Sequence, residues 1–238
     1  NNTLNNIGLD AIEEIDSKTN IDVKALTDKF GFTMPTAEFV NKALQEKEAS
    51  KYWYEKGAQW VDNFLEGFSD EDKDKFFDIL SITSGGVDPK QNLKIAIGVF
   101  SDYKNNRPIR MGFRQYQSLD VFLKSPDNIV NTPKFGNYVD TFKYFTGLSD
   151  RAPNTVNDLQ MARIFGIDPT TLASNPELYA LITNSLNRMT FEINRQLPKG
   201  EELQPYQLQA MMWSNSRGGS SNYEDMGNEL ISELQEKG

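Results

Sequence analysis

Residues 69–100 read SDEDKDKFFDILSITSGGVDPKQNLKIAIGVF, and this stretch decides the fold class. Ser69, with Asp72 three positions later and more acid between them, is typical of a capped helix start. Asp88-Pro89 marks a second start, and the small residues 83–86 form a turn between the two. Both segments carry apolar residues at helical spacing, namely Phe76, Phe77, Ile79, Leu80 and Ile82 and then Leu93, Ile95, Ala96, Ile97, Val99 and Phe100. The stretch therefore predicts two helices joined by a turn.

The rest of the chain shows the same helical periodicity. No two-residue alternation is long enough to indicate a sheet, and no internal repeat is present. We expect an all-α, compact multi-helix globule of about nine or ten helices. The further helices are expected at 7–15, 22–30, 36–65, 115–123, 134–145, 157–165, 177–196, from 205 to about 213, and along the last residues.

We divide the chain into three segments. Residues 1–34 are expected to form an N-terminal helical arm, residues 35–215 a helical core domain, and residues 216–238 a joint with an amphipathic helix. The joint contains Gly218-Gly219. Each end is expected either to pack locally or to dock on the core or on a neighbouring molecule. With 238 residues, 38% of them hydrophobic, the chain has enough material to bury a core.

The absence of Cys and His excludes many chemistries. No disulfide, thiolate nucleophile, Cys/His zinc site or Cys-held iron–sulfur cluster is available. No imidazole base exists, so a Ser-His-Asp triad is excluded. Any catalysis must use Asp, Glu, Lys, Tyr, Ser or backbone groups. We expect no metal and no cofactor.

The formal net charge of −9 is unevenly distributed. Residues 1–80 carry 9 basic and 17 acidic side chains, whereas residues 104–163 carry 9 basic and 5 acidic ones. A uniformly acidic surface argues against nucleic acid, but a basic segment inside an acidic chain leaves that partner open. The strongest candidate patch is Lys104, Arg107, Arg110 and Arg114 with aromatic residues interleaved, and the alternative is an ordinary exposed basic loop.

No apolar run approaches the roughly 18–20 residues that cross a bilayer, so we expect no membrane association. The first residues, Asn1-Asn2-Thr3-Leu4, have neither the basic nor the apolar region of a signal peptide. They also lack an initiator Met, and we expect a chain that is processed, trimmed or cut from a longer one.

Three segments contain the residue types that could carry chemistry. They are Asp78–Ser84 with the following Asn92, Pro133–Tyr138 with Lys134 at a helix start, and Asn154–Arg163 with Asp158 at another helix start. Asp158 is most simply a helix N-terminal charge that accepts from free backbone N–H groups. Lys134 is less expected, because cations are disfavoured at helix N-termini, and it is either functional or an exposed surface lysine. Arg163 most often would pair with a surface carboxylate.

The order of these segments resembles the helix-hairpin-helix DNA glycosylase superfamily, and more closely a group of phage-encoded helical proteins related to it. Ile79-Leu80-Ser81-Ile82-Thr83-Ser84 resembles the family's first motif, Lys134 falls near its hairpin lysine, and Val156-Asn157-Asp158 with Arg163 resembles its third motif. The resemblance spans Tyr52 to Trp213 and implies the glycosylase fold.

The resemblance implies base excision on DNA by cleavage of the N-glycosidic bond. A target nucleotide would be flipped out of the duplex. Asp158 would stabilise the developing oxocarbenium charge or activate water, and Lys134 would serve as an amine nucleophile in a lyase step. The candidate DNA-binding residues are Arg107, Arg110, Arg114, Ser84, Asn92 and Arg163.

The alternative is a catalytically inactive structural or interaction domain of a phage virion or polyprotein, with a phage or host protein as its partner. The acidic composition and the loss of all but Gly136 from the family's glycine-rich hairpin favour this alternative. Either reading places the protein in the host cytoplasm or the virion.

Overall fold

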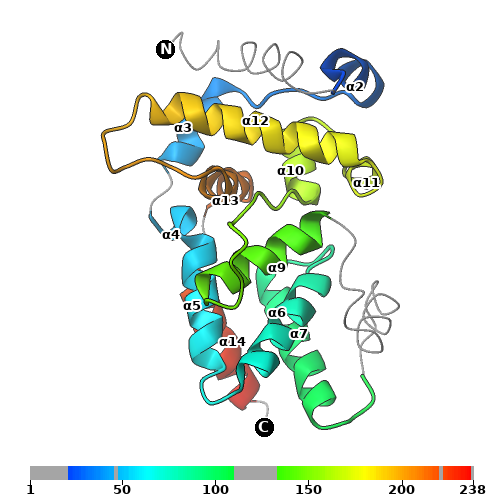
Figure 1. Cartoon of the computed structure of the whole chain (residues 1–238), viewed down its shortest axis with the longest axis vertical. Coiled ribbons are helices and arrows are strands. Elements are labelled where there is room, and N and C mark those ends of the chain that lie inside the picture. The colour runs from blue at the N-terminus through cyan, green and yellow to red at the C-terminus, as the bar shows by residue number, and fades with distance from the viewer. Residues whose placement is uncertain (1–20, 46–47, 110–132, 220–221, 237–238) are drawn as a thin grey trace. The chain divides into compact units, whose positions relative to one another are not determined.

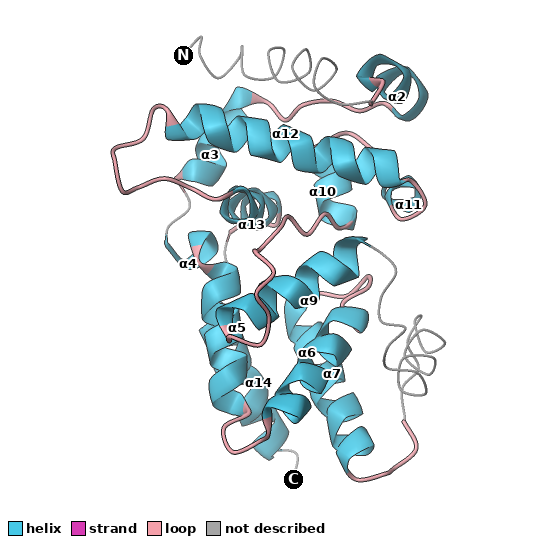
Figure 2. Ribbon diagram, in the orientation of Figure 1, coloured by secondary structure: helices cyan, strands magenta, loops and turns pink. Residues whose placement is uncertain are grey.

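The computed structural model describes residues 21–45, 48–109, 133–219 and 222–236 (Figure 1). Within these ranges the chain forms α-helices, turns and loops without a strand (Figure 2), which confirms the all-α expectation. The helices expected at 7–15 and 115–123 lie outside the described residues. None of the described helices combines the length and the hydropathy needed to cross a bilayer.

The chain divides into two compact units, each built from two separate stretches of sequence. Unit 1 comprises residues 1–52 and 155–220, and unit 2 comprises residues 53–154 and 221–238. The stretch 53–154 of unit 2 therefore lies inside the segment 35–215, which the sequence predicts to be one core domain. Unit 1 contains α2 (Val23–Phe30), α3 (Ala37–Leu44), α4 (Glu48–Lys51), α10 (Leu159–Ile164), α11 (Pro169–Leu172), α12 (Pro176–Asn194) and α13 (Pro205–Ser216), and unit 2 contains α5 (Trp53–Phe64), α6 (Asp70–Ile82), α7 (Pro89–Lys104), α9 (Pro133–Phe145) and α14 (Tyr223–Glu236).

The predicted long helix over 36–65 is wrong. The segment is divided into α3, α4 and α5, and residues 46–47 lie outside the described residues. The physical reason is that the pieces pack against different partners. Helices α3 and α4 contact α13 in unit 1, whereas α5 contacts α9 and α14 in unit 2.

Helix starts follow the local sequence signals closely. Ser69 caps α6, and its Oγ accepts from the backbone N–H of Asp72 at 3.2 Å. Asp88 caps α7 through the backbone N–H of Gln91 at 2.9 Å. Asn175 caps α12, with Pro176 in the first turn. The predicted helix starts at Ser69 and Asp88-Pro89 are confirmed, and α12 begins one residue before the predicted 177, because a cap depends on residues within one turn.

The core of unit 1 is mainly aliphatic and methionine-rich. Helix α13 is buried along most of its length and packs against α3, α4, α10 and α12. Its buried Met211 and Met212 join leucine and isoleucine side chains of α12, including Leu181, Ile182 and Leu186.

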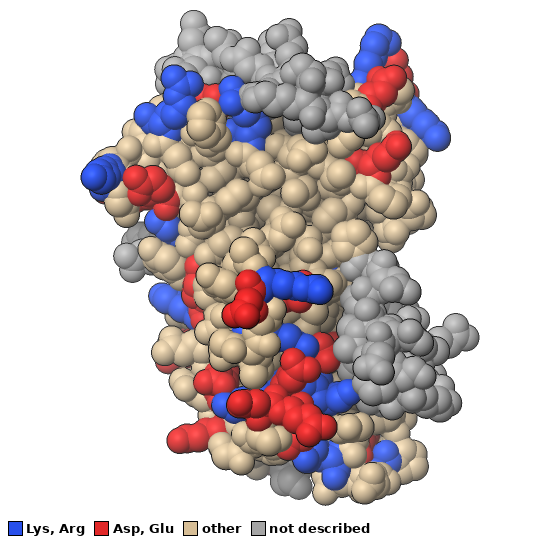
Figure 3. All heavy atoms as spheres, in the orientation of Figure 1, with Lys and Arg blue, Asp and Glu red and all other residues tan. Residues whose placement is uncertain are grey.

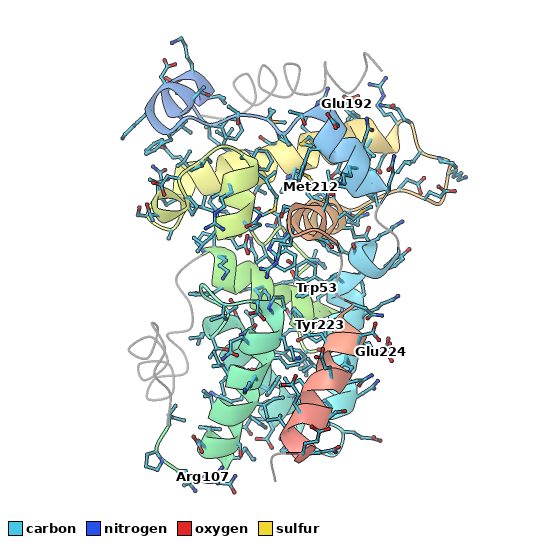
Figure 4. All side chains as sticks on the ribbon, turned by 180° about the vertical axis from the view of Figure 1, so that it is seen from behind. Trp53, Arg107, Glu192, Met212, Tyr223 and Glu224 are labelled. Atoms are coloured by element: carbon cyan, nitrogen blue, oxygen red, sulfur yellow. The ribbon has the colours of Figure 1, made fainter. Side chains whose placement is uncertain are left out.

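The core of unit 2 is mainly aromatic. Helices α6 and α9 pack against each other, α7 packs on α6, and α5 packs on α9 and α14. The aromatic side chains that meet in ring contacts include Trp53, Tyr54, Phe76, Phe77, Phe100, Tyr138, Phe142 and Tyr223. Figure 4 shows Trp53 and Tyr223 side by side near the start of α14.

Two glycines let α5 and α14 approach these rings. A Cβ at Gly227 would lie 2.4 Å from the ring of Trp60, and a Cβ at Gly57 would lie 2.9 Å from the ring of Tyr223. The indole Nε1 of Trp60 donates to Asn228 Oδ1 at 3.0 Å, next to Gly227. Helix α14 is therefore seated on α5 through close contacts that a larger residue would block.

Candidate functional site

The end of α6 is tied to α7 by a buried amide. Asn92 is 2% exposed, and its Nδ2 donates to the carbonyl of Leu80 and to Thr83 Oγ1, both at 2.9 Å. Its Oδ1 accepts from the Tyr138 hydroxyl at 3.3 Å. Burial raises the pKa of Tyr138, so this hydroxyl stays a donor. Asn92 thus links α6, α7 and α9, which is a role in packing that the sequence did not indicate.

Helix α9 begins against the same turn. Ser81 Oγ donates to the carbonyl of Phe135 at 2.7 Å. The amine of Lys134 donates to Ser84 Oγ at 3.1 Å and is 3.3 Å from the Ser84 carbonyl oxygen. It also lies 5.0 Å from the centre of the Phe135 ring. The amine is partly buried and held by several groups, so Lys134 is no ordinary exposed lysine.

Ser81, Thr83, Ser84, Asn92, Lys134 and Tyr138 together form what we call the α6–α9 cluster. Two of the three sequence segments, 78–84 with Asn92 and 133–138, are therefore in contact in unit 2. The cluster contains one amine, one amide, three aliphatic hydroxyls and a phenol. Such groups suit nucleophilic or hydrogen-bonding chemistry.

Asp158 belongs to unit 1 and caps α10. Its Oδ1 accepts from the backbone N–H groups of Gln160 at 2.9 Å and Met161 at 3.0 Å. Its Oδ2 accepts from the indole Nε1 of Trp213 at 3.0 Å. The side chain is partly buried. The interpretation of Asp158 as a helix N-terminal charge is confirmed, and the contact with Trp213, 55 residues away, is new.

A buried polar network supports the backbone before Asp158. The hydroxyl of Tyr179 donates to the carbonyl of Thr155 at 2.9 Å and accepts from the N–H of Asn157 at 3.1 Å. Asn157 Nδ2 donates to Thr183 Oγ1 at 2.9 Å. Within the described residues, Asn157 Oδ1 is buried without a hydrogen-bond partner. The network fixes the extended segment that delivers Asp158 to α10.

The remaining predicted DNA-binding residues are spread over both units. Arg163, on α10, is exposed and donates to Gln160 Oε1 at 3.1 Å. Arg107 follows α7, where it pairs with Asp102 at 3.0 Å and donates to Ser101 Oγ at 2.9 Å. Figure 4 shows Arg107 beyond the end of α7. Arg110 and Arg114 lie outside the described residues. The basic patch predicted around residues 104–114 therefore has its described arginine already paired with an acid.

Charges on unit 2 are interspersed rather than separated by sign. Figure 3 shows acidic and basic side chains intermingled on the face in view. Lys104 pairs with Asp72 at 2.8 Å, and Lys143 pairs with Asp74 at 2.8 Å and with Asp78 at 2.7 Å. In the described part of the chain, no group of three acidic residues is arranged to hold a metal ion.

The predicted catalytic pair, Lys134 and Asp158, belongs to different units. Lys134 joins Ser84 and Asn92 in unit 2, whereas Asp158 and Arg163 lie on α10 in unit 1. Trp213 and Tyr179 are partners of the 155–158 segment that the sequence does not predict. Trp213 carried a usable signal, since a half-buried tryptophan needs a partner for its N–H group.

Comparison of the chain with protein-family models, with curated proteins and with solved structures found no match.

Proposed function

We propose that this chain is a divergent, glycosylase-like protein that acts on DNA, with Lys134 as its reactive amine and Asp158 as a fixed negative charge. The observation that carries the proposal is the partly buried Lys134 amine, 3.1 Å from Ser84 Oγ. A lysine in the first turn of α9 opposes the helix dipole, so its position needs a reason other than helix stability.

The amine has the chemistry that an abasic sugar requires. The open form of that sugar is an aldehyde at C1′. The nitrogen of Lys134 would attack this carbon, the carbonyl oxygen would leave as water, and an imine would join protein and DNA. Ser84 supports this role because its hydroxyl and carbonyl hold the amine at the end of the 79–84 motif.

The hydrogen bonds of the Asp158 carboxylate suit a role in stabilising positive charge better than a role as a proton-abstracting base. Three donors already occupy its two oxygens, and a carboxylate accepts about four hydrogen bonds. The carboxylate is thereby held in one orientation, which is the property that stabilises a cationic sugar during cleavage of the glycosidic bond.

Borohydride trapping tests the proposal. The full chain is incubated with a labelled duplex containing one abasic site, and sodium borohydride reduces any imine to a stable amine. We expect a covalent protein–DNA product that Lys134→Met abolishes. Lys94→Met is the matched control, because Lys94 is an exposed lysine on α7 outside the α6–α9 cluster. A product that survives in Lys134→Met would overturn the role of this lysine.

A second candidate function is an interaction or structural domain without activity, such as a phage virion or polyprotein domain that binds a phage or host protein. The observation that favours it is the complete internal use of Asn92 and the heavy internal use of Asp158. Absence of any trapped product, together with no base release from damaged or uracil-containing duplexes by folded protein, would favour this second candidate.

A further inference from the structure

Two arginines of unit 1 lie on one surface built by α10 and the end of α13. Arg163 donates to Gln160 Oε1 at 3.1 Å, and the Nε2 of Gln160 donates to Ser216 Oγ at 3.0 Å. The next residue, Arg217, places its guanidinium 4.9 Å from the ring centre of Trp213. We call Gln160, Arg163, Trp213, Ser216 and Arg217 the arginine surface. The side-chain amide of Gln160 links Arg163 to Ser216 across this surface.

The two guanidinium groups differ from the other arginines of unit 1. Arg188 and Arg195 both pair with Glu192, at 2.6 Å and 3.2 Å. Figure 4 labels Glu192 on α12. Among the residues that the structure describes, neither Arg163 nor Arg217 forms an ion pair with a carboxylate. Both are exposed, so their charges face solvent.

Asp158 also contacts Trp213 beside this surface. Its Oδ2 accepts from the same Trp213 ring that Arg217 covers, while its Oδ1 is taken by two backbone N–H groups. The Asp158 carboxylate is partly buried and hydrogen-bonded to neutral donors, so it pairs with neither arginine. Arg163 and Arg217 therefore carry positive charges that no carboxylate of the described residues pairs with, on a chain whose net charge is −9.

We propose that the arginine surface binds the phosphodiester backbone of a nucleic acid strand. The planar guanidinium matches phosphate geometry and forms charge-assisted, two-pronged hydrogen bonds. Gln160 and Trp213 hold the two arginines through an amide and a stacked ring, so less side-chain freedom is lost on binding than for exposed lysines. Ser216 and the amide of Gln160 add neutral polar groups between the two phosphate-binding positions.

This inference shares its partner with the proposed function but depends on different residues. Lys134 lies in unit 2 and takes no part in the arginine surface. Binding through Arg163 and Arg217 is therefore expected in a Lys134→Met variant as well. The two proposals fail separately.

Fluorescence anisotropy with a labelled undamaged 20-mer, single-stranded in one arm and duplex in the other, tests the surface across a NaCl series. The variant is Arg163→Gln with Arg217→Gln. The matched control is Arg195→Gln with Lys199→Gln, which also removes two positive charges, from exposed positions just after α12. Circular dichroism checks that each variant is folded.

We expect the variant to lose about 10-fold in affinity at low salt and the control to change less than 2-fold. Each lost phosphate contact lowers the salt dependence, so the slope of log K against log salt should fall by about 1.5 for two contacts. Equal losses in variant and control would overturn the proposal, as would absence of binding by the unchanged protein at low salt. Lys134→Met serves as a third sample. If it still binds but is not trapped by borohydride, the arginine surface stands independently of the lysine chemistry.

Discussion

The two units stabilise a buried or partly buried aspartate through different interactions. In unit 2, Asp78 is 1% exposed in an aromatic core and is neutralised by the side chain of Lys143 at 2.7 Å. In unit 1, Asp158 stays at the edge of an aliphatic core and is held by backbone N–H groups and an indole. Asp78 therefore depends on an oppositely charged side chain, whereas Asp158 depends on neutral hydrogen-bond donors. The contrast shows why Asp158 is the better candidate for chemistry, because its charge is not cancelled by an ion pair.

The environment of Asp78 predicts a pH dependence. Burial raises the pKa of Asp78, and the charge of Lys143 opposes that rise. An acid whose pKa is higher in the folded than in the unfolded state favours folding most when protonated. Its contribution is fully present below the unfolded pKa of about 3.9 and declines as pH rises toward the folded value.

Lys143→Met has the largest expected effect. Removing the lysine leaves the Asp78 carboxylate buried without its cation, and breaking a buried ion pair from one side destabilises by about 3 kcal/mol. Urea unfolding followed by circular dichroism at pH 7 and at pH 4 measures it. The loss should be largest at pH 7 and smaller at pH 4, where Asp78 takes up a proton. A loss independent of pH would show that Lys143 contributes packing instead of charge.

Gly227→Ala has the next largest expected effect, because its Cβ would meet the Trp60 ring at 2.4 Å. Overpacking of this kind costs about 2 kcal/mol, even though alanine is the better helix former. Gly98→Ala on α7 is the control, since a Cβ there has no neighbour within 4 Å among the described atoms. Urea midpoints should fall for Gly227→Ala and stay level or rise for Gly98→Ala. Equal midpoints for both would contradict the close seating of α14.

Asp158→Ala has the smallest expected effect on stability. It removes an N-cap and the acceptor for Trp213, which together cost about 1 kcal/mol. Asp158→Ser restores the cap without the charge and should recover most of that stability. Thermal unfolding compares the three chains. Base release and trapping by the serine variant then separate the charge from the cap, because only a catalytic role for the charge lowers activity in a chain of nearly normal stability.

Local signals in the sequence identified the parts that depend on neighbouring residues. Ser69, Asp88 and Asp158 were each placed at a helix start, and each accepts from backbone N–H groups within one turn. The division of the segment Thr36–Leu65 into separate helices is not predicted by the sequence, because no Pro or Gly interrupts it before Gly57. Periodicity reports that a residue is buried without reporting which unit buries it.

The candidate sites were predicted only in part for a related reason. The sequence marks Lys134 as an unexpected cation at a helix start. It does not show the hydrogen bond from Lys134 to Ser84, because these residues are 50 positions apart in the chain. The contact between Trp213 and Asp158 likewise joins residues 55 positions apart. Arg217 is not predicted as a site residue, because the residues next to it in the sequence do not show which side chains surround it in the fold.

The sequence by itself determined that the chain is helical, where most of its helices begin, and that neither imidazole nor thiol chemistry is available. These properties depend on local periodicity, on capping residues and on composition. Only the tertiary structure decided which aspartate is neutralised in a core and which is held at an edge, and which arginines remain outside ion pairs. Those outcomes are set by packing between segments far apart in the chain, since burial and charge pairing are properties of the neighbours in space.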